Sequence, residues 1–478
     1  MSILESLQPT RVFKYFEEIA TIPHGSGNCS TIAKYCTDFA EKHSLRYVHD
    51  ESDNVIIYKP ATAGYEDSDT IILQGHLDMV LQKTPDCEID LEKEGLELYV
   101  DGDYVKAKGT ILGADNGIAL AMVLAILESD NIPHPAIEAL FTSDEEIGMV
   151  GALALDMNLL SGKKLINIDS EEEDILTVSC AGGSDFSITA PLKRKKAKGT
   201  KVKVSLKGLK GGHSGIEIHK GRVNANILMG RLINTLKDDI DFEILSVSGG
   251  DKGNAIPLMS NLIAVTNTPD QFVSKVTDCL NTVKTEISAR EPDFDFEVLV
   301  EEKSEYDVIG IKKEVIFLMS CAPNGVLKMS AEIEGLVETS LNLGILNTDD
   351  DNLFMLFSLR SNKDSAMKYL EKKLETLCSF VDCEINKGGH YPPWEFRSNS
   401  DLQSLYKKVY AEKQGKDIKV EAIHAGLECG VLASGKQGLD CISVGPNLFD
   451  VHTTQERLSI SSTARVYELI LEVLKQCK

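Results

Sequence analysis

Acidic and histidine side chains follow short apolar segments in two stretches that lie toward opposite ends of this chain. Four such motifs fall between residues 75 and 170, and a fifth falls in residues 445–452, directly after the apolar segment 441–444. In α/β sheets, ligand-binding residues gather at the carboxyl ends of the strands. We therefore expect the two stretches to fold together as one domain, with the residues between them inserted as a second domain.

The sequence on both sides of the insert is typical of an α/β domain with covered sheet faces. Strand-like apolar segments alternate with helical ones, which favours a mixed, mainly parallel sheet. The discontinuous domain is predicted to comprise residues 1–188 and 394–478. Its predicted helices are residues 10–20, 30–43, 117–127 and 462–474, and its predicted strands are residues 54–59, 70–74, 136–142, 164–168 and 441–444.

Residues 189–393 predict an inserted α+β lid domain. Its basic opening segment, residues 193–201, is interpreted as a linker or an edge strand. The order strand, helix, two strands, helix, strand then follows, and a second, looser run of this order begins near residue 312. Two ferredoxin-like halves are one interpretation of this pattern.

Charge and cysteine content exclude several classes of protein. The chain has 50 Lys and Arg against 74 Asp and Glu, and its net charge of -24 repels the phosphates of nucleic acids. The eleven cysteines form no C-x-x-C pair, so reduced thiols are expected. No apolar run approaches the roughly 20 residues that span a bilayer, and the acidic opening segment is not typical of a signal peptide. We expect a cytoplasmic protein without nucleic-acid or membrane partners.

The first motif, Gly75-His76-Leu77-Asp78, follows the strand-like segment 70–74. Residues two apart in an extended chain share one face, so His76 and Asp78 can point to the same place. A metal-bound histidine usually donates its second ring N–H to a carboxylate, and Asp78 could accept it. A surface histidine that lies beside an aspartate by chance is the alternative for this motif alone.

Three further motifs place acids beside apolar segments. Asp115 lies in a glycine-flanked turn before an apolar helix, whereas Glu145 and Glu146 follow a strand-like segment, and so does Asp169. Taken singly, Asp115 could cap its helix, and the paired glutamates could be a solvated helix start. The fifth motif places His452 in the loop after the last predicted strand.

Together these side chains suit a metal site. Carboxylates and imidazoles without thiolates bind zinc, cobalt or manganese in hydrolytic enzymes. Five ligands exceed the four of one tetrahedral ion, whereas two ions about 3.5–4 Å apart that share a carboxylate use all five. Such a pair lowers the pKa of a bridging water and polarises a substrate carbonyl. The sequence therefore predicts a hydrolase with two divalent ions per chain.

These motifs, in this order, resemble those of the co-catalytic di-zinc exopeptidase and deacylase family. The similarity is greatest to its aminoacyl-histidine dipeptidase branch, the Xaa-His or cytosol non-specific dipeptidases. It spans essentially the whole chain and includes the segments NIDSEEE at 167–173 and HAGLECG at 424–430. The resemblance implies hydrolysis of Xaa-His and other dipeptides, with zinc as the expected metal.

The resemblance also implies which residues hold each ion. His76 and Asp169 would bind one ion, Glu146 and His452 would bind the other, and Asp115 would bridge the two.

Two more residues of this domain gain a role from the resemblance. Asp78 would orient His76, and Glu145 would be the general base that takes a proton from the bridging water and passes it to the leaving amine. The metal charge nearby would keep both paired glutamates ionised. A cis peptide bond between Asp115 and Asn116 is expected on the same ground.

Five further residues match substrate-binding positions of the family, three in the insert and two after it. His213 would stabilise the oxyanion, Asn254 and Arg360 would hold the substrate backbone and carboxylate, and His424 and Gly426 would line the site. A guanidinium binds a carboxylate through two parallel hydrogen bonds, which suits this role. A plain loop around His213 and a structural salt bridge for Arg360 are the alternatives.

The metal ligands alone do not separate several related functions. A di-zinc N-acyl amino acid deacylase or a tripeptidase could use the same centre, and a non-catalytic metal-binding protein is the third alternative. The resemblance further implies a homodimer formed through the inserted domain, with domain motion during turnover.

Overall fold

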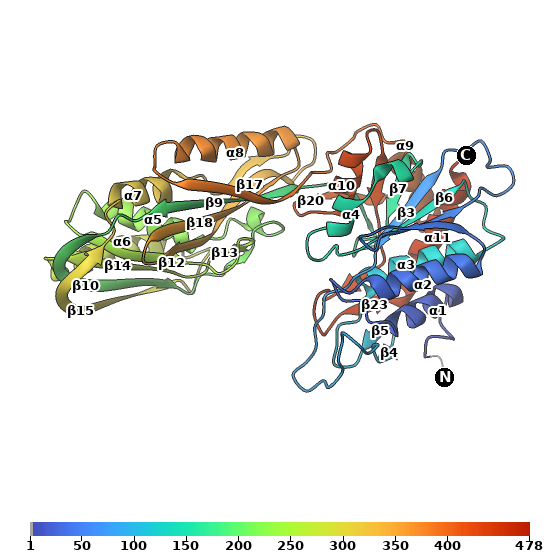
Figure 1. Ribbon diagram of the computed structural model, residues 1–478, viewed down its shortest axis with the longest axis horizontal. Helices are drawn as coiled ribbons and strands as arrows, with labels where there is room; N and C mark the ends of the chain where they lie inside the picture. The colour runs from blue at the N-terminus through green and yellow to red at the C-terminus, as the bar shows by residue number, and fades with distance from the viewer. Residues whose placement is uncertain (1–2) are drawn as a thin grey trace. The chain divides into compact units, whose positions relative to one another are not determined.

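The structure is a computed structural model, and it describes residues 3–478. The chain forms two compact units. The described residues up to 180, with 396–422 and 427–478, make unit 1, and residues 181–395 with 423–426 make unit 2. The blue N-terminal and red C-terminal parts of the chain therefore share unit 1 (Figure 1). Within residues 3–478, no helix has both the length and the apolar character needed to cross a bilayer.

The first boundary differs from the predicted one because β9 (Gly182–Pro191) is one continuous strand. It pairs along its whole length with β18 (Asn352–Ser361), so residues 182–188 belong to unit 2. The boundary predicted after residue 188 cuts this strand. At the other end, the prediction divides the chain after residue 393, and the structure divides it after residue 395.

Unit 1 contains a mixed sheet whose centre is parallel. Its middle strands β6, β3, β7 and β21 run parallel, and the flanking pairs that involve β1, β2 and β8 are antiparallel. This is the predicted fold class. In the order of the sheet, the strands of the described chain are β1 (Arg46–His49), β2 (Val55–Lys59), β6 (Ile137–Thr142), β3 (Ile71–His76), β7 (Lys164–Asn167), β21 (Asp440–Ser443), β8 (Ile175–Cys180) and β20 (Lys419–Ile423).

Helices pack on this sheet, and α3 (Ala114–Glu128) is the most deeply buried of them. Its residues 117–127 are all buried, because they are apolar or small on every side of the helix. It contacts α1 (Thr10–Ala20) and β3 (Figure 1). The other helices of the unit are α2 (Ser30–Lys42), α4 (Val150–Ala154), the short η1 (Met157–Leu159), α9 (Asp401–Gln414), α10 (Glu428–Gly435) and α11 (Ile460–Gln476).

A small second sheet in unit 1 joins the C-terminal loop to the segment before α3. It pairs β22 (Leu448–Phe449) with β23 (Arg457–Ser459), then with β5 (Tyr104–Ala107) and β4 (Leu98–Asp101). The loop between β22 and β23 contains His452.

Unit 2 is built on an antiparallel sheet with two halves of the same topology. One half has the strand order β15-β10-β14-β12, and the other has β19-β9-β18-β17. Each half is a ferredoxin-like unit, and the two meet where β12 pairs with β17. The strands not yet defined are β10 (Lys195–Lys207), β12 (Glu243–Gly249), β14 (Ser260–Thr266), β15 (Asp295–Val308), β16 (Gly325–Met329), β17 (Val337–Thr348) and β19 (Glu384–Tyr391), with the separate pair β11 (Gly212–His213) and β13 (Ala255–Ile256).

Four helices complete the two halves and share one apolar core with the sheet. Helix α8 lies along β9 and β18 (Figure 1). From Val202 to Leu206, buried side chains of β10 alternate with partly exposed ones, as expected for a strand with one face on a core. The helices are α5 (Ala225–Leu236), α6 (Pro269–Ile287), α7 (Lys312–Cys321) and α8 (Asp364–Cys378), and η2 (Ile218–Lys220) is a short additional turn.

Of the two alternatives for the basic segment 193–201, the linker is wrong, because from Lys195 onward the segment is part of β10. Residues 195–199 pair with β15 and pairing with β14 begins only at Thr200, so most of the segment has an edge-like position. Acids on neighbouring strands compensate its charge: Lys196 lies 2.6 Å from Asp307, and Lys201 lies 2.7 Å from Glu301. Opposite charges across a strand pair stabilise the pairing.

Candidate metal centre

The parallel centre of the sheet in unit 1 brings the sequence motifs together. Strands β6, β3 and β7 are neighbours, and their carboxyl ends lead to Glu146, His76 and Asp169. Asp115 lies in the first turn of the buried helix α3, and His452 comes from the loop between β22 and β23. Residues from both flanks of the insert therefore meet at one sheet edge, as the sequence predicts.

Asp115 lies between the two histidines and offers one carboxylate oxygen to each. Its Oδ1 lies 3.2 Å from Nε2 of His76, and its Oδ2 lies 3.1 Å from Nε2 of His452. Asp169 Oδ1 lies 3.6 Å from the same nitrogen of His76, and Glu146 Oε1 lies 2.9 Å from that of His452. The cluster thus has two subsites that share Asp115.

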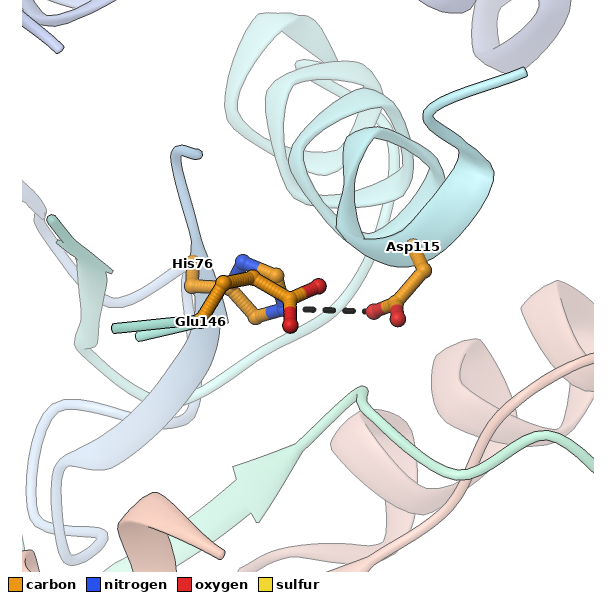
Figure 2. A group of neighbouring side chains, drawn as sticks. All are labelled: His76, Asp115 and Glu146. Atoms are coloured by element: carbon orange, nitrogen blue, oxygen red, sulfur yellow. Dashed lines mark hydrogen bonds and ion pairs between the residues drawn. The ribbon is translucent and has the colours of Figure 1, made fainter. Parts of the chain in front are cut away.

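These donor atoms fit a pair of divalent cations. One ligand atom each from His76, Asp115 and Glu146 lies within 4.8 Å of the others, and Figure 2 shows the three side chains converging on one place. The donor atoms are imidazole nitrogens and carboxylate oxygens, the set that zinc, cobalt and manganese accept. His76, Asp169 and Asp115 could hold one ion, and Glu146, His452 and Asp115 could hold the other.

The ring of His76 is oriented by Asp78, although mainly through the backbone rather than the predicted carboxylate. Its Nδ1–H donates to the carbonyl oxygen of Asp78 at 3.0 Å, and the Oδ1 atom of Asp78 lies farther away at 3.5 Å. Because a carbonyl can only accept, Nδ1 carries the proton and Nε2 faces the cluster. The orienting role predicted for Asp78 therefore uses its main chain.

The Asp78 carboxylate instead holds the backbone that carries the paired glutamates. Its Oδ1 accepts the N–H of Glu145 at 2.9 Å, and its Oδ2 accepts the N–H of Glu146 at 3.2 Å and the hydroxyl of Ser26 at 2.7 Å. Burial tends to raise the pKa of Asp78, but the hydrogen bonds and the charge of His76 outweigh it and lower the pKa. Asp78 therefore fixes both the histidine and the two glutamates.

Asn116 is a site residue that the motif analysis missed. Its Nδ2 donates to Asp169 Oδ1 at 2.8 Å, and its Oδ1 accepts the N–H of His76 at 3.2 Å. The Asp115–Asn116 peptide bond is cis, which confirms that prediction. Asn116 is buried, and a single polar residue at the start of an apolar helix gives no sequence signal that it contacts the cluster.

The carboxylate of Glu145 lies in a region of strong negative charge. Removal from water raises the pKa of this side chain well above its ordinary value, and Asp169, Glu428 and Glu146 add to the rise while His76 opposes it. A carboxyl group that holds a proton readily is suited to take up and release one.

A buried polar network lies beneath the cluster and was not predicted. The amide of Gln74 donates to Glu428 at 2.5 Å and accepts from Asn167 at 2.6 Å, and the hydroxyl of Thr142 donates to Glu428 at 2.7 Å. Burial raises the pKa of Glu428 to about 7. Gln74, Thr142 and Asn167 sit near the ends of β3, β6 and β7, so the network ties together the strands that carry the ligands.

In unit 2, three of the five predicted substrate residues gather around Gly215. A Cβ atom on this glycine would lie 2.9 Å from Cε1 of His213, 3.0 Å from Nε of Arg360 and 2.7 Å from the carbonyl oxygen of His424. Glycine is therefore required at this position. Gly426 lies in the same short segment as His424, residues 423–426.

Arg360 has an N–H donor that no described residue accepts. Its Nη1 donates to the hydroxyl of Tyr391 at 2.9 Å, and its buried Nε has no partner among residues 3–478. No carboxylate of the described residues lies within ion-pair distance of it, which argues against the alternative of a structural salt bridge. The backbone carbonyl of Asn254 accepts the N–H of Ser214 at 2.8 Å, beside this cluster.

His424 is held as a neutral ring. Its Nε2 lies 2.7 Å from the hydroxyl of Ser340, and its Nδ1 lies 3.3 Å from Oδ1 of Asn362. Burial, followed by the charge of Arg360, lowers its pKa to about 3. A neutral histidine adds no charge beside Arg360, so the guanidinium dominates the electrostatics of this cluster.

Metal affinity of the cluster is expected to rise with pH. Hydrogen bonds to Asp115 and Glu146 raise the pKa of His452 in the metal-free chain to about 11, so below that pH its ring holds a proton that a metal must displace. The apparent affinity should therefore increase by about tenfold per pH unit for each proton released. Calorimetric titration with cobalt in buffers of different ionisation enthalpy measures the affinity and the number of protons released. An affinity that is independent of pH would contradict the expectation.

Comparison with known proteins identifies the family. A model of peptidase family M20/M25/M40 matches residues 72–476. The cytosol non-specific dipeptidase of Escherichia coli (strain K12) is 36% identical over 481 residues, which cover 100% of this chain and 99% of that protein. The crystal structure of aminoacylhistidine dipeptidase from Vibrio alginolyticus is 34% identical, covers 99% of this chain and 97% of its own, and superposes with a TM-score of 0.91.

More distant structures share the fold alone. Aminopeptidase PepT from Bacillus cereus ATCC 10987 is 18% identical, with a TM-score of 0.58 over 98% of this chain and 99% of its own. The family match covers most of the chain, and the Escherichia coli relative is similar over its full length. On this evidence, the chain belongs to peptidase family M20/M25/M40.

Proposed function

We propose that this chain is a metal-dependent dipeptidase that hydrolyses Xaa-His and other dipeptides. The observation that carries the proposal is the position of Asp115, whose two carboxylate oxygens each face one histidine, with Glu145 on the adjacent loop. The names of the two similar dipeptidases, one from Escherichia coli and one from Vibrio alginolyticus, support the substrate class.

The ligands proposed above fit two divalent ions, and we propose zinc as the metal, with cobalt or manganese as substitutes. When bound, the ions supply the positive charge that polarises a peptide carbonyl and lowers the pKa of water. His76, Asp115, Glu146, Asp169 and His452 are the proposed ligands. The remaining steps depend on side chains of this chain.

Glu145 is the proposed general base. Its carboxylate takes a proton from the attacking water as the C–O bond forms, and it gives the proton to the amide nitrogen as the C–N bond breaks. One water is consumed, and an acid and an amine are released. The N–H of Glu145 is held by the Asp78 carboxylate at 2.9 Å, which fixes the position of the base.

The cluster around Arg360 in unit 2 is the proposed binding site for the substrate's terminal carboxylate. The unpartnered Nε of Arg360, together with Nη1, offers the donors that a carboxylate needs. His213 is proposed to stabilise the oxyanion and Asn254 to hold the substrate backbone, and His424 and Gly426 line this site.

Replacement of Arg360 by alanine is expected to raise KM for dipeptides by about 10- to 100-fold, since a charged hydrogen-bonding partner of the substrate is lost. The metal content should not change, because the ligands belong to unit 1. Steady-state kinetics measure KM, and elemental analysis measures the metal content. Arg231→Ala is the matched control, because Arg231 forms an exposed ion pair with Glu286 in the same unit. Equal losses of metal and of substrate affinity would contradict this role.

We further propose that the protein acts in the cytosol as a homodimer formed through unit 2. All eleven cysteines are free in the described residues, which suits a reducing compartment, and the name of the Escherichia coli relative includes the cytosol. The dimer is supported by exposed apolar side chains on β15 and β16, among them Val300 and Leu327. Sedimentation of the pure protein measures its oligomeric state, and a monomer at micromolar concentration would contradict the dimer.

The test of the proposed function is hydrolysis of a substrate panel by the metal-loaded protein. The panel contains Xaa-His dipeptides, other dipeptides, tripeptides and N-acyl amino acids, and EDTA-treated protein is the control. Dipeptides should be cleaved fastest, and EDTA should abolish the activity. Preferential cleavage of tripeptides or of N-acyl amino acids would support the tripeptidase or the deacylase instead, and no hydrolysis of any substrate would contradict all three.

A further inference from the structure

Glu456 occupies an unusual position between the two flanks of the chain. It lies four residues after His452, and it is 2% exposed. Its carboxylate accepts four consecutive backbone N–H groups: those of Leu112 and Gly113 on Oε2, both at 2.9 Å, and those of Ala114 and Asp115 on Oε1, at 3.0 and 3.2 Å. A single side chain therefore binds the whole backbone turn that leads into Asp115.

These four donors are not satisfied by the helix that follows them. The first N–H groups of an α-helix have no partner within it, and α3 begins at Ala114. Helices usually satisfy these groups with a local side chain, but the one used here is more than 340 residues away in sequence. The bonds therefore couple two distant segments of the chain.

Other contacts that hold the loop of His452 are made by exposed side chains: Arg457 forms an ion pair with Asp450, and the hydroxyl of Thr453 donates to the Asp450 carbonyl at 2.6 Å. Residues 452–455 are exposed or partly exposed, and the His452 side chain itself is 51% exposed, so Glu456 is the buried end of this stretch. Asp450 and His452 both have left-handed backbone conformations, with φ of 54° and 62°. Such conformations are unfavourable for residues other than glycine, so contacts with the rest of the unit help the loop to keep them.

We propose that Glu456 is a positioning residue for the metal pair, an inference that rests on the proposed two-metal function. By binding the amides of residues 112–115, its carboxylate fixes the Asp115 backbone relative to the His452 loop. This sets the separation of Asp115 Oδ2 and His452 Nε2, which is 3.1 Å. Both residues bind the same proposed ion, so the affinity for that ion depends on this anchor. Groups that orient metal ligands typically contribute about 10- to 100-fold to metal affinity.

The alternative is that Glu456 only caps helix α3 and stabilises the fold. A matched control separates the two roles. Glu138 is also a buried carboxylate on backbone amides of unit 1: it accepts the N–H of Ser161 at 2.8 Å and that of Gly162 at 3.0 Å. It lies on β6 near the amino end of the strand, whereas the ligands follow the carboxyl ends.

The experiment is titration of metal-free protein with Co²⁺, followed by calorimetry and by visible absorption, with thermal unfolding of the metal-free protein measured in parallel. Glu456→Gln keeps the size of the side chain but turns an amide N–H toward backbone donors. It should weaken binding of at least one Co²⁺ by about tenfold or more. Glu138→Gln should lower the unfolding temperature while binding Co²⁺ like the wild type.

Wild-type Co²⁺ affinity for both ions in Glu456→Gln would overturn the proposal, whatever the change in unfolding temperature. If Glu456→Gln does not fold, Glu456→Asp takes its place, because it keeps the charge and shortens the anchor by one methylene. Weaker Co²⁺ binding in folded Glu456→Asp supports the proposal, and unchanged binding overturns it. Failure of the wild type to bind two Co²⁺ would count against the proposed function itself, so the two failures are distinguishable.

Discussion

Replacement of Glu145 by glutamine is expected to lower kcat for dipeptide hydrolysis by about 10³-fold, because a general base of this kind contributes on the order of 10²- to 10⁴-fold. Glutamine has nearly the same size and keeps the backbone N–H that Asp78 accepts, but it cannot take a proton. The metal ligands are untouched, so both ions should remain bound. Steady-state kinetics measure kcat, and elemental analysis of the same sample measures the bound metal.

The control for this variant is Glu172→Gln, which removes an exposed acid from the segment that follows Asp169. Its kcat should equal that of the wild type. Full activity in Glu145→Gln would remove Glu145 from the mechanism. Loss of metal together with activity would mean that this glutamate is a ligand rather than the base.

Replacement of Asp115 by alanine should remove both metal ions and abolish hydrolysis. The reason is geometric: each carboxylate oxygen of Asp115 faces a different histidine, at 3.2 Å for His76 and 3.1 Å for His452. Without the shared ligand, each subsite keeps two side chains, fewer than the three protein ligands that catalytic zinc sites usually have. Elemental analysis after gel filtration should find close to no bound metal.

The comparison variant is His452→Ala, which removes a ligand from one subsite and leaves His76, Asp169 and Asp115 for the other. It should retain close to one ion per chain. If Asp115→Ala retained as much metal as His452→Ala, Asp115 would serve one subsite rather than both, and the shared-ligand proposal would fail.

Much of the metal cluster could be predicted from the sequence, since local rules place each of its residues. Apolar strand-like segments lead directly to His76, Glu146 and Asp169, and parallel strands bring such ends to one edge. The structure brings these residues together with Asp115 and His452, and the cis bond after Asp115 is also confirmed. Their roles as metal ligands stay a prediction until metal content is measured.

The residues that support the cluster could not be predicted in this way. Asn116, Glu428 and Glu456 act through contacts between segments that are 40 to 354 residues apart. The amide of Asn116 and the carboxylate of Glu456 resemble ordinary polar residues in the sequence. Whether such a group faces solvent or a backbone amide depends on packing, for which the local pattern carries no signal.

The strand pairings of the inserted unit also could not be predicted from the local sequence pattern. The repeated order of helices and strands was readable from residue 201 onward, but the first strand of the second ferredoxin-like half is β9, which precedes the first half in sequence. The pairing of β9 with β18 and β19 joins segments that are distant along the chain. The basic residues of β10 show a related effect, since the acids that compensate them lie on a strand about a hundred residues later.

The sequence by itself determined the fold class, the insertion and the side chains that form the proposed metal cluster, because apolar periodicity and the placement of acids and histidines at strand ends are local properties. Only the tertiary structure decided how the ligands are held: that Asp78 orients His76 through its carbonyl, that Asn116 bonds both His76 and Asp169, and that Glu456 ties the loop of His452 to the turn of Asp115. Hydrogen bonds between distant segments require both partners at a defined distance and angle, and folding of the whole unit sets that geometry.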